Sequence, residues 1–62
     1  MIYDNVRAIC DKKKLSFNDL EELAGIGHGT IGKWKFTSPR VETVQKVADA
    51  LKVPITTLLK SG

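Results

Sequence analysis

Apolar residues recur along this chain at intervals of three and four positions, which places them on one face of an α-helix. Five segments show this spacing, and they are separated by breaks that include Gly25, Pro39 and Val53-Pro54. The pattern therefore predicts an all-α, five-helix fold in a single domain that spans residues 1–62.

Three of the five segments lie outside residues 17–36. The first covers residues 4–13, with Ile2 and Tyr3 leading into it; the fourth begins at Val41, and the short fifth begins at Ile55 and ends at Ser61-Gly62. From the stripes of the first four segments we expect a core that includes Val6, Ile9, Leu20, Ala24, Ile31, Trp34, Val44, Val47, Ala48 and Leu51. Cys10 also lies on an apolar face and is interpreted as a small core residue.

Residues 17–36, FNDLEELAGIGHGTIGKWKF, contain two short helical patterns joined by a glycine turn. The first pattern has a stripe made of Phe17, Leu20, Leu23 and Ala24. Ser16 precedes it and forms a capping-box arrangement with Asp19. Gly25 ends this helix, since glycine adopts the left-handed C-cap conformation most easily. The layout is that of a helix-turn-helix.

The second pattern, residues 28–35, has two faces. Ile31 and Trp34 lie on one face, and the other, which carries no acidic side chain, consists of His28, Gly29, Gly32 and Lys33. Each glycine inside a helix costs roughly 1 kcal/mol relative to alanine, so we expect the two glycines to allow close approach to another surface. In a helix-turn-helix the second helix lies in the major groove of DNA.

Motifs inside and outside this stretch resemble one family. KKKLS before it, GTIGKW within it and SPRVETVQKVADALKV after it resemble the Cro/CI repressors, also called Xre-type regulators, and in particular small regulators of Gram-positive bacteria and their phages. The resemblance covers nearly the whole chain. It implies a lambda-repressor-like fold and repression of transcription by a homodimer on a near-palindromic, double-stranded DNA operator.

The exposed face and the resemblance together predict the contacts with DNA. Base contacts are expected at His28, Gly29, Gly32 and Lys33. Phosphate contacts are expected at the flanking cations, hydroxyls and helix-start amides of Lys35, Thr37, Ser38 and Arg40. Alternatively, His28 only helps to begin the helix and Lys33 only meets phosphate. In the fifth segment, the apolar residues either complete the core or contact a second protomer; these are Ile55, Leu58 and Leu59.

Three features depart from the family pattern. Phe17 stands where a glutamine usually touches a phosphate or base, and Glu21 stands where a small alanine usually lets the helices pack closely. Cys10 and Lys35 occupy the positions of an arginine–glutamate pair. Because both members of that pair are missing together, the prediction of the fold is unchanged.

Composition and charge are consistent with this prediction but do not extend it. The chain is 42% hydrophobic and 27% charged, as globular domains are, and its formal net charge of +3 fits a polyanionic partner. The lysines at positions 12–14 favour the C-terminal dipole of the first helix, with contact to the DNA backbone as the alternative.

Candidate chemistry is sparse, because His28 is the only histidine and Cys10 the only cysteine. We expect no catalytic site, metal site, disulfide, cofactor or small-molecule ligand. No apolar run approaches the ~20 residues that span a bilayer, and no charged-then-apolar leader precedes the domain. A cytoplasmic protein that acts at the nucleoid is expected, and the resemblance implies a bacterial or phage origin.

Two alternatives remain open. The same fold could serve as a protein-interaction module, such as an antitoxin or anti-repressor partner, and its recognition face would then favour large apolar residues. The chain could also be the N-terminal part of a longer repressor, with oligomerisation or induction encoded beyond Gly62.

Overall fold

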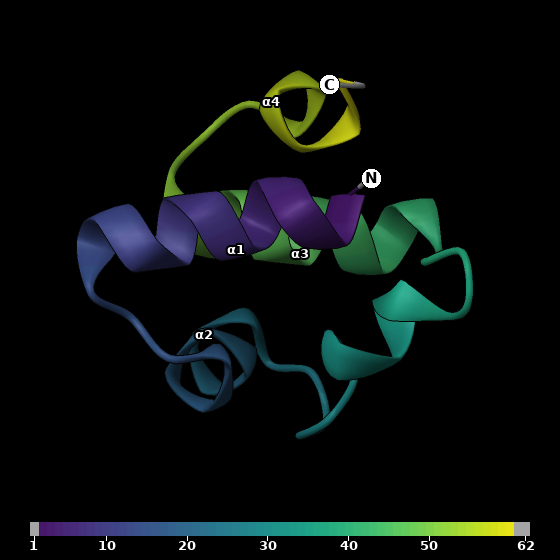
Figure 1. Cartoon of the computed structure of the whole chain (residues 1–62), viewed down its shortest axis with the longest axis horizontal. Helices are drawn as coiled ribbons and strands as arrows, with labels where there is room; N and C mark the ends of the chain where they lie inside the picture. The colour runs from purple at the N-terminus through teal and green to yellow at the C-terminus, as the bar shows by residue number, and fades with distance from the viewer. Residues whose placement is uncertain (1, 61–62) are drawn as a thin grey trace.

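The computed structural model describes residues 2–60 (Figure 1). Its elements are α1 (Ile2–Lys13), α2 (Phe17–Ala24), the 3₁₀ helix η1 (Gly32–Lys35), α3 (Val41–Leu51) and α4 (Ile55–Leu59). No strand occurs within that range, so the all-α prediction is confirmed. The expected helix over residues 28–35 is instead a turn over residues 28–31 followed by η1. The predicted end of the last helix at Ser61-Gly62 lies outside the described residues.

The helices surround one hydrophobic core. Helix α3 packs on α2 and α4, while α1 packs on α4, η1 and α2. Figure 1 shows α1 in front of α3, with α4 on one side of this pair and α2 with the following turn on the other. Every helix contributes to the buried apolar residues, which are Tyr3, Val6, Cys10, Leu20, Ile31, Trp34, Val44, Val47, Ala48, Leu51 and Leu58.

The structure corrects the predicted core at three places. Ile9 and Ala24 are only partly buried, although both pack against the core. Leu23, expected on the buried stripe of α2, is 65% exposed. Glu21 is buried on that helix instead, with 1% of its surface exposed.

Local hydrogen bonds fix both ends of α2. The Ser16 hydroxyl oxygen accepts a hydrogen bond from the N–H of Asp19 at 3.1 Å, which confirms Ser16 as the N-cap. Gly25 follows the helix with a φ of +72°, and its N–H donates to carbonyl oxygens of α2. The chain therefore leaves α2 through the left-handed turn predicted for this glycine.

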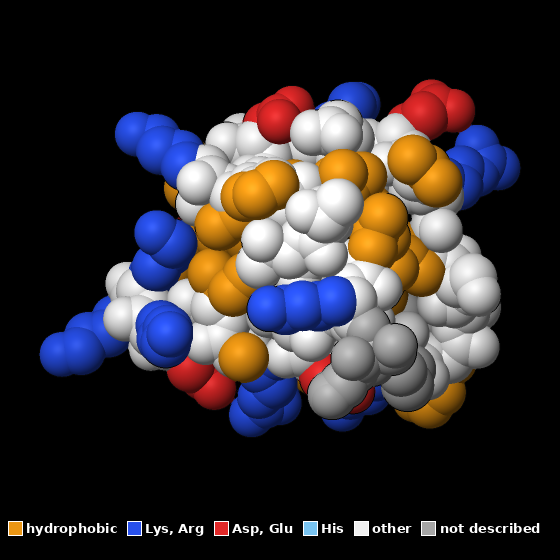
Figure 2. Space-filling model, turned by 90° about the horizontal axis from the view of Figure 1, so that it is seen from above, with side chains coloured by type: hydrophobic (Ala, Val, Ile, Leu, Met, Phe, Trp, Pro, Cys, Tyr) orange, Lys and Arg blue, Asp and Glu red, His pale blue; other side chains and the backbone are white. Residues whose placement is uncertain are grey.

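Asn5 ties the last helix to the first. Its Nδ2 donates to the carbonyl oxygens of Leu58 and Lys60, at 2.8 and 2.7 Å. Leu58 is fully buried and completes the core, so the structure removes it from the candidate dimer contacts. Leu59 is 47% exposed and Ile55 is half-buried. Figure 2 looks onto the face around α4, where hydrophobic side chains lie among lysine and arginine side chains.

Candidate nucleic-acid interface

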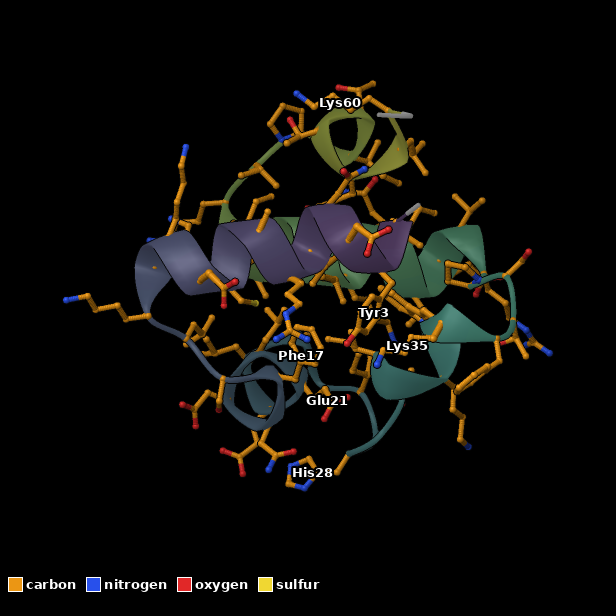
Figure 3. All side chains as sticks on the ribbon, viewed as in Figure 1. Tyr3, Phe17, Glu21, His28, Lys35 and Lys60 are labelled. Atoms are coloured by element: carbon orange, nitrogen blue, oxygen red, sulfur yellow. The ribbon has the colours of Figure 1, made fainter. Side chains whose placement is uncertain are left out.

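A buried carboxylate shapes the recognition segment, which we define as residues 28–35. Glu21 extends from α2 towards the turn that begins this segment (Figure 3). Its Oε1 accepts a hydrogen bond from the N–H of Gly29 at 3.1 Å, and its Oε2 accepts one from the N–H of Ile31 at 3.0 Å. Amides at the start of a helical segment have no partner within it, so Glu21 satisfies two such donors.

The backbone of Gly29 makes this arrangement possible. Gly29 has a φ of +88°, in the left-handed region that side chains rarely adopt. With the chain turned in this way, the N–H groups of Gly29 and Ile31 converge on one carboxylate, as in the backbone nests that bind anions. The conformation of the turn by itself therefore accounts for a glycine at position 29.

Gly32 is different, because nothing within the described structure requires a glycine there. Its φ lies outside the left-handed region, and a Cβ built on it would meet no atom within 4 Å. Its neighbours Ile31 and Trp34 are buried, with 0% and 5% of their surface exposed, so the segment is fixed on its inner side. Gly32 and Lys33 are exposed.

The residues predicted to contact bases are all on the surface. His28, Gly29, Gly32 and Lys33 are exposed. His28 Nε2 lies 3.5 Å from Glu22 Oε1, and both side chains are largely exposed. The segment itself carries no acidic residue, but the turn brings this carboxylate from α2 beside it. The residue pattern of the segment does not reveal this neighbour, because Glu22 lies on a different helix.

Lys35 lies against aromatic residues at the edge of the interface. Its Nζ is 5.1 Å from the centroid of the Tyr3 ring, within the range of a cation–π interaction. The Tyr3 ring in turn meets Phe17 nearly edge-on, with centroids 5.6 Å apart. Figure 3 shows these three side chains between α1, α2 and η1. The contact joins η1 to α1. These two elements contain Lys35 and Cys10, the positions at which the arginine–glutamate pair is missing.

The loop after η1 holds the other predicted phosphate contacts. Thr37, Ser38 and Arg40 are exposed there. The Thr37 hydroxyl donates to the Lys33 carbonyl oxygen at 3.1 Å, and the Thr37 N–H donates to the same oxygen at 3.0 Å. These bonds close the end of the recognition segment and leave the loop's polar side chains on the surface next to it.

The described residues include one cysteine, which lies in the core. Cys10 is 2% exposed, and burial raises the pKa of its thiol, with a smaller contribution from Asp11. No group of three or more His, Cys, Asp or Glu side chains within residues 2–60 could hold a metal ion. No helix in this range has the length and apolar character needed to cross a membrane.

Comparison with protein families gives a match over most of the chain. A family model described as the Cro/C1-type HTH DNA-binding domain matches residues 5–61. The matched range includes α2, the whole recognition segment and both helices that follow it. No curated protein and no solved structure matches the chain.

Proposed function

The chain belongs to the Cro/C1-type helix-turn-helix family of DNA-binding domains, and we propose that it represses transcription by binding a specific double-stranded operator. The recognition segment enters the major groove and α2 lies across the backbone. The observation that carries the proposal is the two-sided recognition segment: Ile31 and Trp34 hold it in the core while its other side is exposed. Residues 1–62 then act as one DNA-binding domain at the nucleoid, in the cytoplasm.

The exposed groups divide into base and backbone contacts. We assign direct base contacts to His28 and Lys33, because both can donate to guanine O6 and N7. The absence of a side chain at Gly29 and Gly32 lets the segment lie deep in the groove. We assign phosphate contacts to the flanking polar residues Lys35, Thr37, Ser38 and Arg40, whose cations and hydroxyls bind without regard to sequence. The Thr37 hydroxyl donates to the Lys33 carbonyl oxygen in the free protein, so it must release that contact to bind phosphate.

Two protomers are expected on each operator. In this arrangement the half-sites lie about one helical turn apart, and the site is near-palindromic. Leu59, which is 47% exposed, and the half-buried Ile55 four positions before it supply the apolar surface of α4 for the contact between protomers. If so, Leu59→Lys should weaken cooperative binding to a full operator and leave binding to an isolated half-site unchanged.

The test is selection of bound duplexes from a randomised DNA pool, followed by footprinting of the enriched sequence. The proposal predicts an enriched motif with two related half-sites, both protected from cleavage. A Lys33→Ala protein should lose the enrichment at one position of each half-site. A pool without any enriched motif would contradict the proposal and favour a protein-interaction module of the same fold.

A further inference from the structure

We propose that Glu21 is a positioning residue for DNA recognition: by binding the N–H groups of Gly29 and Ile31, it fixes the conformation in which the recognition segment meets the bases. The inference rests on the proposed function and adds a determinant of sequence preference that does not itself touch DNA. Glu21 is 1% exposed, and both its carboxylate oxygens bind backbone amides of the recognition segment.

Glu21 stabilises one conformation of the start of the recognition segment. Residues 28–31 form a turn, and residues 32–35 continue as a 3₁₀ helix rather than as the α-helix that the sequence predicted. The left-handed Gly29 within the turn directs two amides to one point. The N–H of Ile31 is buried there, and a buried amide without an acceptor is strongly unfavourable, whereas the N–H of Gly29 is only partly buried. The carboxylate at that point therefore selects this turn over other conformations of the same residues.

The bonds to Glu21 also limit which groups of the recognition segment can bind DNA. Free amides at the start of a recognition helix can bind a phosphate. Here the N–H groups of Gly29 and Ile31 are already bound to Glu21. Recognition at this end of the segment is therefore left to side chains, chiefly the neighbouring His28, and to the exposed backbone around Gly32.

The position of a side chain in the groove decides which bases it can distinguish. A functional side chain must be held within about 0.5 Å of its productive position. The two amides bound by Glu21 lie between His28 and Lys33 along the chain. Fixing the backbone at positions 29 and 31 thus fixes the distance and orientation between the two predicted base contacts. Loss of this support should reduce discrimination between bases more than it reduces affinity for the DNA backbone.

The test compares Glu21→Gln and Glu21→Ala with Val47→Ala. Glutamine keeps the size of the side chain but replaces one acceptor oxygen with a donor, whereas alanine removes both acceptors. Val47 is fully buried in α3, and its truncation destabilises the core without touching these hydrogen bonds. Each protein is assayed well below its melting temperature on the selected operator, on singly substituted operators and on unrelated DNA.

We expect the ratio of operator affinity to unrelated-DNA affinity to fall about tenfold or more in Glu21→Ala. A tenfold fall lies within the range of discrimination expected from one base contact. Glu21→Gln should give an intermediate loss, and Val47→Ala should keep the parent's preference. Affinity for unrelated DNA should stay equal or rise slightly in the Glu21 variants, because a negative charge is removed. An unchanged preference in both Glu21 variants, or an equal loss in Val47→Ala, would overturn the inference.

A second readout does not depend on DNA. Amide hydrogen exchange at Gly29 and Ile31 should accelerate in Glu21→Gln, with exchange in α3 unchanged. If the parent protein showed no sequence preference, the proposed function would fail, and this readout would still decide whether Glu21 holds the segment. Unaltered exchange at both amides would overturn the positioning role.

Discussion

The carboxylate of Glu21 and the backbone N–H of Ile31 are joined by a 3.0 Å hydrogen bond across ten positions of the chain. The side chain of Ile31 is at the same time fully buried in the core. The start of η1 is therefore held through its backbone by α2 and through a side chain by the rest of the domain. Both connections keep the outer side of the recognition segment on the surface.

Truncation of Ile31 should destabilise the whole domain. Ile31→Ala removes a fully buried side chain, which costs about 2 to 5 kcal/mol. The measurement is the midpoint of chemical or thermal unfolding. Leu23→Ala in α2 is the control, because Leu23 is 65% exposed and its loss should change stability by only about 0.5 kcal/mol or less. An unchanged midpoint for Ile31→Ala would show that the core is assigned incorrectly.

The two glycines of the recognition segment should respond oppositely to alanine. Gly29→Ala forces a side chain into the left-handed region and should destabilise the free protein by about 1 to 2 kcal/mol. Gly32→Ala should be neutral or stabilise it by up to about 1 kcal/mol, since a Cβ there meets no atom. Gly32→Leu should fold normally and lose operator binding. Equal stability changes for both alanine variants would contradict this assignment.

Removal of the charge of Glu22 should strengthen DNA binding. Glu22 lies beside His28, where its carboxylate repels approaching phosphates and competes for the imidazole. Glu22→Gln should raise affinity for all duplexes by about two- to fivefold at low salt, and the gain should shrink as salt increases. Asp49→Asn in α3 provides a charge-matched control. Equal binding by the Glu22→Gln protein would place His28 and Glu22 away from the DNA, and weaker binding would mean that Glu22 supports the contact instead of opposing it.

The buried thiol of Cys10 should couple stability to pH. Burial raises the pKa of Cys10 above its ordinary value, so the folded protein keeps the thiol proton to higher pH than the unfolded chain does. The free energy of unfolding should therefore fall as pH rises from the ordinary thiol pKa towards the raised one. Urea unfolding at pH 7 and pH 10 measures this fall. Cys10→Ala should show a smaller fall, and an identical fall would contradict the assigned cause.

Periodicity alone does not decide which residue is buried beside the stripe of α2. At about 100° per residue, Glu21 lies roughly 40° beyond Phe17 and Leu23 roughly 60° beyond Leu20, on opposite margins of that stripe. Hydrophobicity favoured leucine as the buried residue. The structure buries glutamate because its carboxylate finds two amide donors from another part of the chain, and no local pattern contains that information.

The shape of the recognition segment could not be obtained from the same pattern. Ile31 and Trp34 were correctly placed on the buried side, since their spacing suits either an α-helix or a 3₁₀ helix. The turn over residues 28–31 depends on the left-handed Gly29 and its contact with Glu21. In the same way, Leu58 and Leu59 are adjacent apolar residues, and only packing against α1 and α3 separates the buried one from the exposed one.

If the outer side of the recognition segment determines sequence preference, variants of its side chains should change binding to a panel of singly substituted operators. His28→Ala and Lys33→Ala should each relax preference at a different base pair, by about 1 to 3 kcal/mol, while most affinity for unrelated DNA remains. Lys35→Ala is the matched control, because loss of a phosphate contact should weaken all duplexes alike and lower the salt slope by about one unit. If His28→Ala and Lys33→Ala both kept the parent's preference at every position, the assignment of this surface would be wrong.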